Sequence, residues 1–269
     1  MIVWLNGQWL TDDSAHIPVQ DRGFTLGDGL FETIKARHGR PLHLADHWQR
    51  LTAGAAILRL PLPLTMAELE QAIIESLIRN DMSDAALRLT ISRGSGQRGL
   101  LPPNPTLPTV LLTASPLPAP MGPASLHVAQ QVRRNPSSPL CRCKTLSYLD
   151  NILARIEAAD AGCDDALLLS TDGFVCETTI ANLFAVLADG CIVTPPLAHG
   201  VLPGVRRAGL LQSGLAHEQG LMLKDLLTAQ EIFLTNALSV RAVTRIGTTL
   251  IGQGKTGPIC QKIMDSLDE

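Results

Sequence analysis

Hydrophobic and polar positions in the first 115 residues follow two periods, which predicts strands mixed with helices. Two apolar runs flank the pair Asn6-Gly7, the pattern of a tight β-hairpin. From residue 29 to 36, Leu30, Glu32 and Ile34 alternate with Phe31, Thr33 and Lys35, as the two faces of a strand do. Residues 65–80 instead place apolar side chains three and four positions apart, as an amphipathic helix does. The expected elements are a hairpin over 2–10, strands over 29–36, 86–91 and 110–113, and helices over 44–59 and 65–80.

The pattern breaks at residues 116–123, which hold four prolines and one glycine. This composition keeps the backbone extended and excludes a helix or a central strand. We therefore expect an N-terminal α+β domain over 1–115, a linker over 116–123 and a C-terminal α/β domain over 124–269. The second domain is expected to hold strands over 126–133, 166–170, 182–186, 191–194 and 231–235, a hairpin-like pair over 242–251, and helices over 148–161, after 202–204, over 227–230 and at the C-terminus.

Composition narrows the class of protein. Of 269 residues, 45% are hydrophobic and 17% charged, enough for one large core or two modest ones. The net charge of -3 provides no broad basic surface for nucleic acid or anionic lipid. The sequence shows neither a signal peptide nor a membrane-spanning stretch, so we expect a cytoplasmic protein without nucleic-acid or membrane partners. The six cysteines are expected to be small apolar residues, and none has the spacing of a metal site.

A covalent amine nucleophile has few candidates, because the chain contains only five lysines. Lys144 is flanked by residues 140–143 and 145–148, whose largely apolar side chains would desolvate an ammonium group and lower its pKa. A lysine whose stem packs while its amine reaches water explains the same pattern equally well. The composition alone leaves the two interpretations about even.

Several motifs together resemble one family. They are residues 144–155, 166–169, 172–173, 177–184 and 202–207 in the second half, with 21–23, 27–33 and 47–51 in the first. In this order they resemble the class IV aminotransferases, pyridoxal-phosphate enzymes of fold type IV. The resemblance covers nearly the whole chain and implies a two-domain α+β fold with mixed sheets and flanking helices. It also implies that the C-terminal domain binds the cofactor.

The resemblance assigns roles to three side chains. Lys144 would form the Schiff base with pyridoxal 5'-phosphate and move the proton of the substrate. Glu177 would face the pyridine nitrogen and keep it protonated. Tyr148, the only tyrosine, would hydrogen-bond the ring hydroxyl. Without the family, a solvated acid after a turn is the preferred interpretation of Glu177, and a half-buried helix aromatic is a fair alternative for Tyr148.

The phosphate group would be bound by a helix start, one arginine and a turn. A helix N-terminus supplies backbone N–H groups and a favourable dipole, and an arginine adds a charge-assisted hydrogen bond. The expected residues are Gly204, Val205, Arg206, Arg50, Asn236, Ala237 and Leu238. For Arg50 the alternative is a helix-surface arginine, and for the turn it is an ordinary exit from a strand.

The glycine-rich residues 91–100 do not have the spacing of a nucleotide-binding loop, and prolines follow directly. We interpret them as a mobile loop that contacts substrate. Arg98 lies where a D-amino-acid transaminase carries a carboxylate-binding arginine, while the same stretch resembles 4-amino-4-deoxychorismate lyase. Both resemblances imply a small anionic amine as substrate.

The sequence leaves two reactions open, that of the lyase and that of a transaminase. Thr33 on the expected cofactor-facing strand, the 91–100 loop and the 235–238 turn favour the lyase, which forms 4-aminobenzoate and pyruvate in folate biosynthesis. Phe31 and Leu100 replace the tyrosine and histidine of a D-amino-acid transaminase. Tyr148 and the 252–258 ending look more like transaminases. We predict the lyase, with Thr33 catalytic and with Phe31 and Arg98 contacting substrate. The alternatives are a transaminase of D-amino or branched-chain amino acids and a catalytically silent cofactor-binding protein; the family implies a homodimer.

Overall fold

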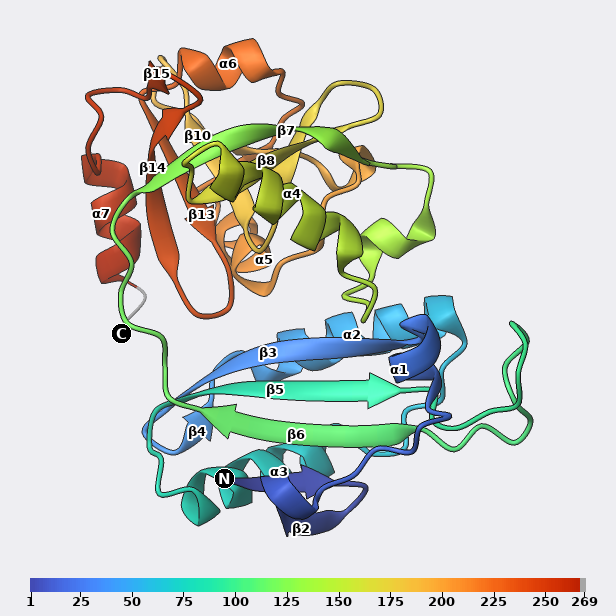
Figure 1. Cartoon of the computed structure of the whole chain (residues 1–269). Helices are drawn as coiled ribbons and strands as arrows, with labels where there is room; N and C mark the ends of the chain where they lie inside the picture. The colour runs from blue at the N-terminus through green and yellow to red at the C-terminus, as the bar shows by residue number, and fades with distance from the viewer. Residues whose placement is uncertain (267–269) are drawn as a thin grey trace. The chain divides into compact units, whose positions relative to one another are not determined.

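The computed structural model describes residues 1–266 and divides the chain into two compact units. The first unit comprises Met1–Ala119 together with Cys143–Ser147, and the remainder of the chain forms the second. Each unit has its own sheet and its own hydrophobic cores. The chain therefore leaves the first unit after residue 119, returns to it for five residues and leaves again (Figure 1).

The first unit is built on a six-stranded antiparallel sheet in the order β2-β1-β6-β5-β3-β4. Its strands are β1 (Ile2–Leu5), β2 (Gln8–Thr11), β3 (Gly29–Arg37), β4 (Arg40–Pro41), β5 (Ala85–Ser92) and β6 (Thr109–Ser115). The expected hairpin over 2–10 is present, with Asn6 and Gly7 both at positive φ in its turn. Side chains of β3 at even positions, such as Leu30 and Ile34, enter the core.

Two helices, α2 (Leu44–Leu58) and α3 (Met66–Arg79), cover one face of this sheet (Figure 1). The start of α3 is fixed by a capping box, because the Thr65 side chain accepts from Glu68 N while the Glu68 carboxylate accepts from Thr65 N. Leu69, Ile73 and other apolar side chains of α3 are buried against the strands. The helical spacing in the sequence thus marked the buried face correctly.

The returning segment, Cys143–Ser147, runs alongside β3. Phe31 N donates to Lys144 O at 2.9 Å, and Leu146 N donates to Gly29 O at 3.0 Å. Gly29 is required here, since a Cβ at this position would lie 2.4 Å from Ile91 O. Lys144 is therefore held by backbone pairing to the strand that carries Phe31 and Thr33.

The second unit has a nine-stranded mixed sheet with the path β12-β11-β10-β13-β14-β7-β8-β9, and β15 pairs with β14. Its strands are β7 (Ala124–Arg134), β8 (Asp165–Ser170), β9 (Val175–Thr178), β10 (Asn182–Val186), β11 (Ile192–Thr194), β12 (His217–Glu218), β13 (Glu231–Thr235), β14 (Val240–Ile246) and β15 (Thr249–Leu250). An additional pairing of β9 with β10 closes the path on itself. Glu177 on β9, Asn182 on β10 and Thr235 on β13 are therefore neighbours in the sheet.

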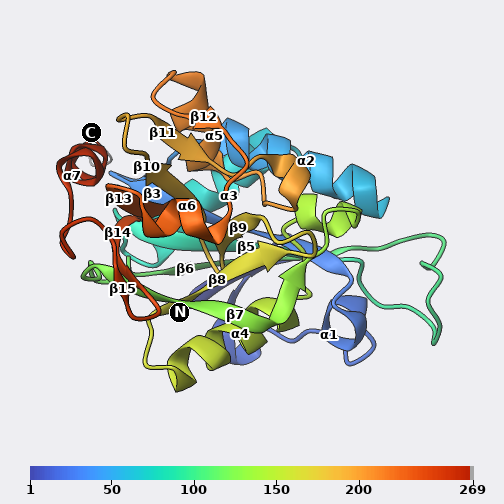
Figure 2. The ribbon, with the colours of Figure 1, turned by 90° about the horizontal axis from the view of Figure 1, so that it is seen from above.

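Four helices belong to the second unit: α4 (Leu149–Asp160), α5 (Val205–Gln212), α6 (Leu223–Leu227) and α7 (Pro258–Asp265). Figure 2 shows α4 alongside β7, where Ala154 and Ala158 are buried in a small core with strand residues. None of the helices described over residues 1–266 is both long enough and apolar enough to traverse a lipid bilayer.

Two helices differ from the sequence-based expectation. Helix α1 (Arg22–Leu26) was not predicted, because five residues are too few to show a helical period. Helix α6 ends at Leu227, where a helix over 227–230 was expected to begin. Its start is fixed by the Asp225 carboxylate, which accepts from Met222 N at 2.8 Å. The apolar run at 226–227 therefore closes this helix instead of opening one.

Candidate active site

The candidate nucleophile lies on the face of the first sheet opposite α2 and α3. Phe31 and Thr33 are two positions apart on β3, so both point to this face, away from Leu30 and Ile34. The Lys144 Nζ lies 4.3 Å from the centroid of the Phe31 ring. The Arg88 guanidinium lies 3.9 Å from the same ring. The structure thus brings together Lys144, Phe31 and Thr33, and it adds Arg88.

Lys144 is a half-buried residue. Its role as the covalent attachment point stays a prediction. Its ammonium lies against the face of a buried aromatic ring, where a cation–π interaction stabilises the charge. The amine is therefore oriented by Phe31, which is the property that a covalent attachment point needs.

Arg50 lies on the helix-covered face of the sheet, where Glu32 binds it. Arg50 Nε donates to Glu32 Oε1 at 2.8 Å, and the His47 Nδ1 lies 2.8 Å from Glu32 Oε2. The Glu32 side chain is almost completely buried, and burial alone would raise its pKa. Hydrogen bonds from Arg50 and His47 overcome this effect and lower the pKa of Glu32 to about 2. The expected contact of Arg50 with phosphate stays a prediction.

The loop that carries Arg98 connects β5 to β6 and projects beyond the ends of the strands (Figures 1 and 2). Arg98 is exposed and lines a hollow of about 770 Å³ within the first unit, with Arg22, Leu26 and Leu100 among its other walls. The hollow offers the exposed Arg98 side chain beside apolar surface, whereas the buried Arg22 guanidinium is bound to Asp28 and to carbonyls of the loop. This combination suits an anionic group attached to a hydrocarbon.

In the second unit Glu177 is the centre of a buried polar cluster. Its carboxylate accepts from Arg134 Nη2, from Asn182 Nδ2 at 3.1 Å and from Leu202 N at 3.2 Å. Burial would lower the pKa of Arg134, yet the facing carboxylate of Glu177 raises it above its usual value. Glu177 is thus a buried side chain held by three hydrogen bonds, not a solvated side chain after a turn.

The start of α5 is tied directly to this cluster. Besides Glu177, the Asn182 carboxamide contacts the turn before the helix, donating from Nδ2 to Leu202 O at 3.0 Å. The N-cap is Gly204, where a Cβ would lie 1.8 Å from Asn182 Oδ1, so any larger residue would displace the Asn182 side chain. The helix N-terminus is therefore held close to the acidic side chain.

Thr235 adds to the Glu177 cluster a hydroxyl that has no hydrogen-bond partner among the described residues. In the sheet register Asn182 lies between Glu177 on β9 and Thr235 on β13. Thr235 is 1% exposed, and among residues 1–266 its Oγ1 has no hydrogen-bond partner. A buried hydroxyl without a partner costs free energy unless a ligand binds it. This row of acid, amide and hydroxyl beside a helix start fits a cofactor with a basic ring nitrogen and a phosphate.

The remaining predicted residues lie at the edges of the second unit's cluster. In the 236–238 turn, Asn236 Oδ1 accepts from Leu238 N at 2.9 Å, so the turn is held by its own side chain. Tyr148 is the N-cap residue of α4. The contributions of these residues to cofactor binding stay predictions.

Comparisons with known proteins identify the family of the chain. Residues 29–246 match the model of the amino-transferase class IV family. The chain belongs to this family. Along its whole length it is 35% identical to the putative branched-chain-amino-acid aminotransferase of Methanocaldococcus jannaschii, 96% of which is covered.

Two further class IV relatives bear on the activity. The aminodeoxychorismate lyase of Bacillus subtilis is 31% identical over 88% of this chain and 83% of the lyase. The crystal structure of the branched-chain amino acid aminotransferase of Escherichia coli superposes with a TM-score of 0.92 at 27% identity, covering 99% of this chain and 93% of that one. The predicted family, fold class, enzyme class and cofactor are confirmed: class IV aminotransferases use pyridoxal 5'-phosphate.

The sequence-based reasoning missed several residues of the candidate site. Arg88 carries no local signal, because a lone arginine on a strand is usually a solvated side chain. Asn182 lies inside the 177–184 motif, and its place directly after a turn was the available clue. Arg134 ends β7, and only the fold brings it to Glu177.

Proposed function

We propose that the protein is a transaminase that moves the amino group of a branched-chain amino acid to a 2-oxo acid. One observation carries the choice of substrate: the 35% identity to a putative branched-chain-amino-acid aminotransferase extends over the entire chain.

Different residues of the chain hold the cofactor, move the proton and bind the phosphate in this proposal. Lys144 Nζ anchors the cofactor and carries the proton away from the α-carbon of the substrate and back. Glu177, fixed by Arg134 and Asn182, keeps a proton on the ring nitrogen. The start of α5 and the Thr235 hydroxyl bind the phosphate. When bound, pyridoxal phosphate supplies an electron sink for the bond that breaks.

The second candidate is the aminodeoxychorismate lyase that the sequence analysis favoured. Thr33 supports it, because its hydroxyl lies on the face of β3 that also holds Phe31 and Lys144. The Bacillus subtilis lyase supports it as well, at lower identity and coverage than the archaeal transaminase. The two reactions differ in where the proton goes after Lys144 removes it.

A paired assay separates the two candidates. The cofactor-loaded protein is incubated with L-leucine, L-valine or D-alanine plus 2-oxoglutarate, and separately with aminodeoxychorismate. We expect kcat/KM for the branched substrates to exceed that for D-alanine by about tenfold or more, because each added methylene contributes to binding. Formation of 4-aminobenzoate and pyruvate, without 2-oxo acid from leucine or valine, would show that the protein is the lyase. The Lys144→Ala variant provides the blank.

We also propose a homodimer, because α4 exposes an apolar stripe at positions i, i+3, i+4 and i+7. Leu149, Ile152, Leu153 and Ile156 are 69%, 50%, 51% and 52% exposed. Contiguous exposed apolar side chains of this kind mark interaction surfaces. Light scattering is expected to give twice the 28.8 kDa of one chain.

The double variant Ile152→Glu/Ile156→Glu is expected to be monomeric, because it places two charges in the stripe. Ile78→Glu is the matched control, since Ile78 is 68% exposed on α3. A monomeric wild-type protein, or a dimeric double variant, would exclude this surface.

A further inference from the structure

The loop between β5 and β6, residues 93–108, is held at both of its stems by one buried carboxylate. Asp21 Oδ2 accepts from Ser92 Oγ at 2.8 Å and from Thr109 Oγ1 at 2.7 Å. These two residues are the last of β5 and the first of β6. Asp21 is 1% exposed and also caps α1 by accepting from Gly23 N at 2.7 Å. The two ends of the loop are therefore fixed to the start of α1.

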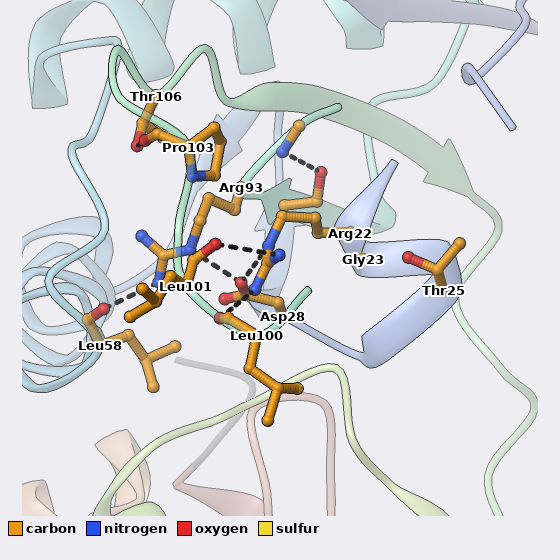
Figure 3. A network of polar contacts seen from close by, with 12 residues as sticks. Arg22, Gly23, Thr25, Asp28, Leu58, Arg93, Leu100, Leu101, Pro103 and Thr106 are labelled. Atoms are coloured by element: carbon orange, nitrogen blue, oxygen red, sulfur yellow. Dashed lines mark hydrogen bonds and ion pairs between the residues drawn. The ribbon is translucent and has the colours of Figure 1, made fainter. Parts of the chain in front are cut away.

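The next residue, Arg22, holds the far part of the loop (Figure 3). Its Nη1 donates to Gly99 O at 2.9 Å and its Nη2 donates to Leu100 O at 2.8 Å, while Leu101 O lies 3.5 Å from Nη1. One buried guanidinium thus binds carbonyls of three consecutive residues. A guanidinium presents five donors from three nitrogens in one plane, whereas lysine presents three donors from a single atom, so the two residues are not equivalent here.

Asp28 orients the guanidinium. Its Oδ2 accepts from Arg22 Nε at 2.9 Å and from Arg93 Nε at 2.8 Å, and Figure 3 shows both side chains directed at this carboxylate. Arg93 in turn donates to Leu58 O and Arg59 O at the end of α2. Although burial would raise the pKa of Asp28, the two arginines lower it, so the carboxylate stays ionised at neutral pH.

Few hydrogen bonds lie within the loop itself, and the one from Thr106 Oγ1 to Pro103 O at 2.9 Å is an example. Most of its residues from 95 to 107 are exposed, and they form no helix or strand. Gly96 lies against Arg22 and against Pro103 of the loop, since a Cβ at this position would be 3.1 Å from Arg22 Cδ and 3.5 Å from Pro103 Cγ. A loop of this length, with few contacts of its own, depends on the side chain that binds its backbone.

We infer that Arg22 is a positioning residue that holds the 93–108 loop in one conformation and thereby sets Arg98 at the hollow it lines. Arg22 binds the carbonyls directly after Arg98, at residues 99–101, so the anchor and the expected substrate contact are adjacent. The effect on substrate rests on the proposed function, whereas the anchoring of the loop does not. Loss of Arg22 would release the loop without removing any group that touches the cofactor.

Limited proteolysis tests the anchoring without substrate or cofactor. Trypsin cleaves after Arg98, which is exposed, but cleavage requires the segment to leave its hydrogen bonds. We expect the fragment of residues 1–98 to appear about tenfold faster in Arg22→Ala and in Arg22→Lys than in the wild type. Arg37→Ala is the matched control, because Arg37 forms a partly exposed pair with Asp84 at 2.9 Å. Cleavage at the wild-type rate in both Arg22 variants, or protection by lysine, would overturn the inference.

Steady-state kinetics test the consequence for substrate. In Arg22→Lys, a variant whose folding is checked by its thermal midpoint, we expect KM for the substrate to rise about tenfold while kcat changes less than about twofold. An unchanged KM with faster cleavage would show that the loop does not position a substrate contact. If the protein turns over none of the proposed substrates, the tryptic result still decides the role of Arg22.

Discussion

Replacing Lys144 with alanine is expected to lower kcat by a factor on the order of 10⁴ or more and to remove the visible absorption of the cofactor-bound protein. The variant lacks both the covalent attachment point and the proton carrier, whereas the Phe31 ring and the backbone pairing to β3 remain. The expected loss is therefore chemical and not structural. Absorption spectra and single-turnover rates measure it.

Lys262→Ala is the matched control, because Lys262 is exposed on α7 and far in sequence from every motif of the family. It is expected to keep the colour and the activity of the wild type. A Lys144→Ala protein that stays coloured and retains a tenth or more of the wild-type rate would refute the assignment of Lys144 as the attachment point.

Glu32→Ala is expected to lower the free energy of unfolding by about 3 to 5 kcal/mol. The variant removes the carboxylate that binds Arg50 and His47, and it leaves two basic side chains next to a cavity inside the first unit. Urea denaturation of the wild type and the variant measures the difference. Glu75→Ala is the control, since Glu75 forms an exposed pair with Arg79 at 2.7 Å and should contribute less than about 1 kcal/mol.

The same residue predicts how stability depends on pH. Glu32 has a pKa of about 2 in the folded protein and an ordinary value of 4.5. Because the folded value is the lower one, the contribution is complete above pH 4.5 and declines as the pH falls towards 2. Its full size is on the order of 3 kcal/mol. Glu32→Gln should flatten the fall in stability between pH 5 and 3, and an unchanged slope would contradict the pKa shift.

Most elements were predictable from the sequence because they depend on local pattern. The buried face of α3 follows the spacing of Leu69 and Ile73, and its start follows the capping pair Thr65 and Glu68. The pairing of residues 143–147 with β3 was not predictable, since a period shows that a segment is extended but not which strand it joins. Five-residue α1 was too short for any period.

The sequence predicted those residues of the candidate site that lie in family motifs. Lys144 was singled out among five lysines by its apolar flanks, and the family resemblance then assigned roles to Lys144 and Glu177. Phe31 was predicted as a substrate contact, and only the structure shows its ring beside the Lys144 amine. Arg22 belonged to a recognised motif, yet its contacts with carbonyls nearly eighty residues later in the chain arise only from the tertiary fold. Two residues that hydrogen-bond across a long stretch of chain cannot be identified from the local sequence pattern around either one.

The route of the chain limits how this protein can be recombined with its relatives. The stretch Cys143–Ser147 belongs to the first unit although the chain on either side of it belongs to the second. A chimera joined once, near residue 119, would pair β3 from one parent with the lysine-bearing stretch of the other. Exchanging whole units therefore requires three junctions. A hybrid made with a single junction is expected to combine Lys144 from one parent with Phe31 from the other, two residues that did not evolve in the same protein.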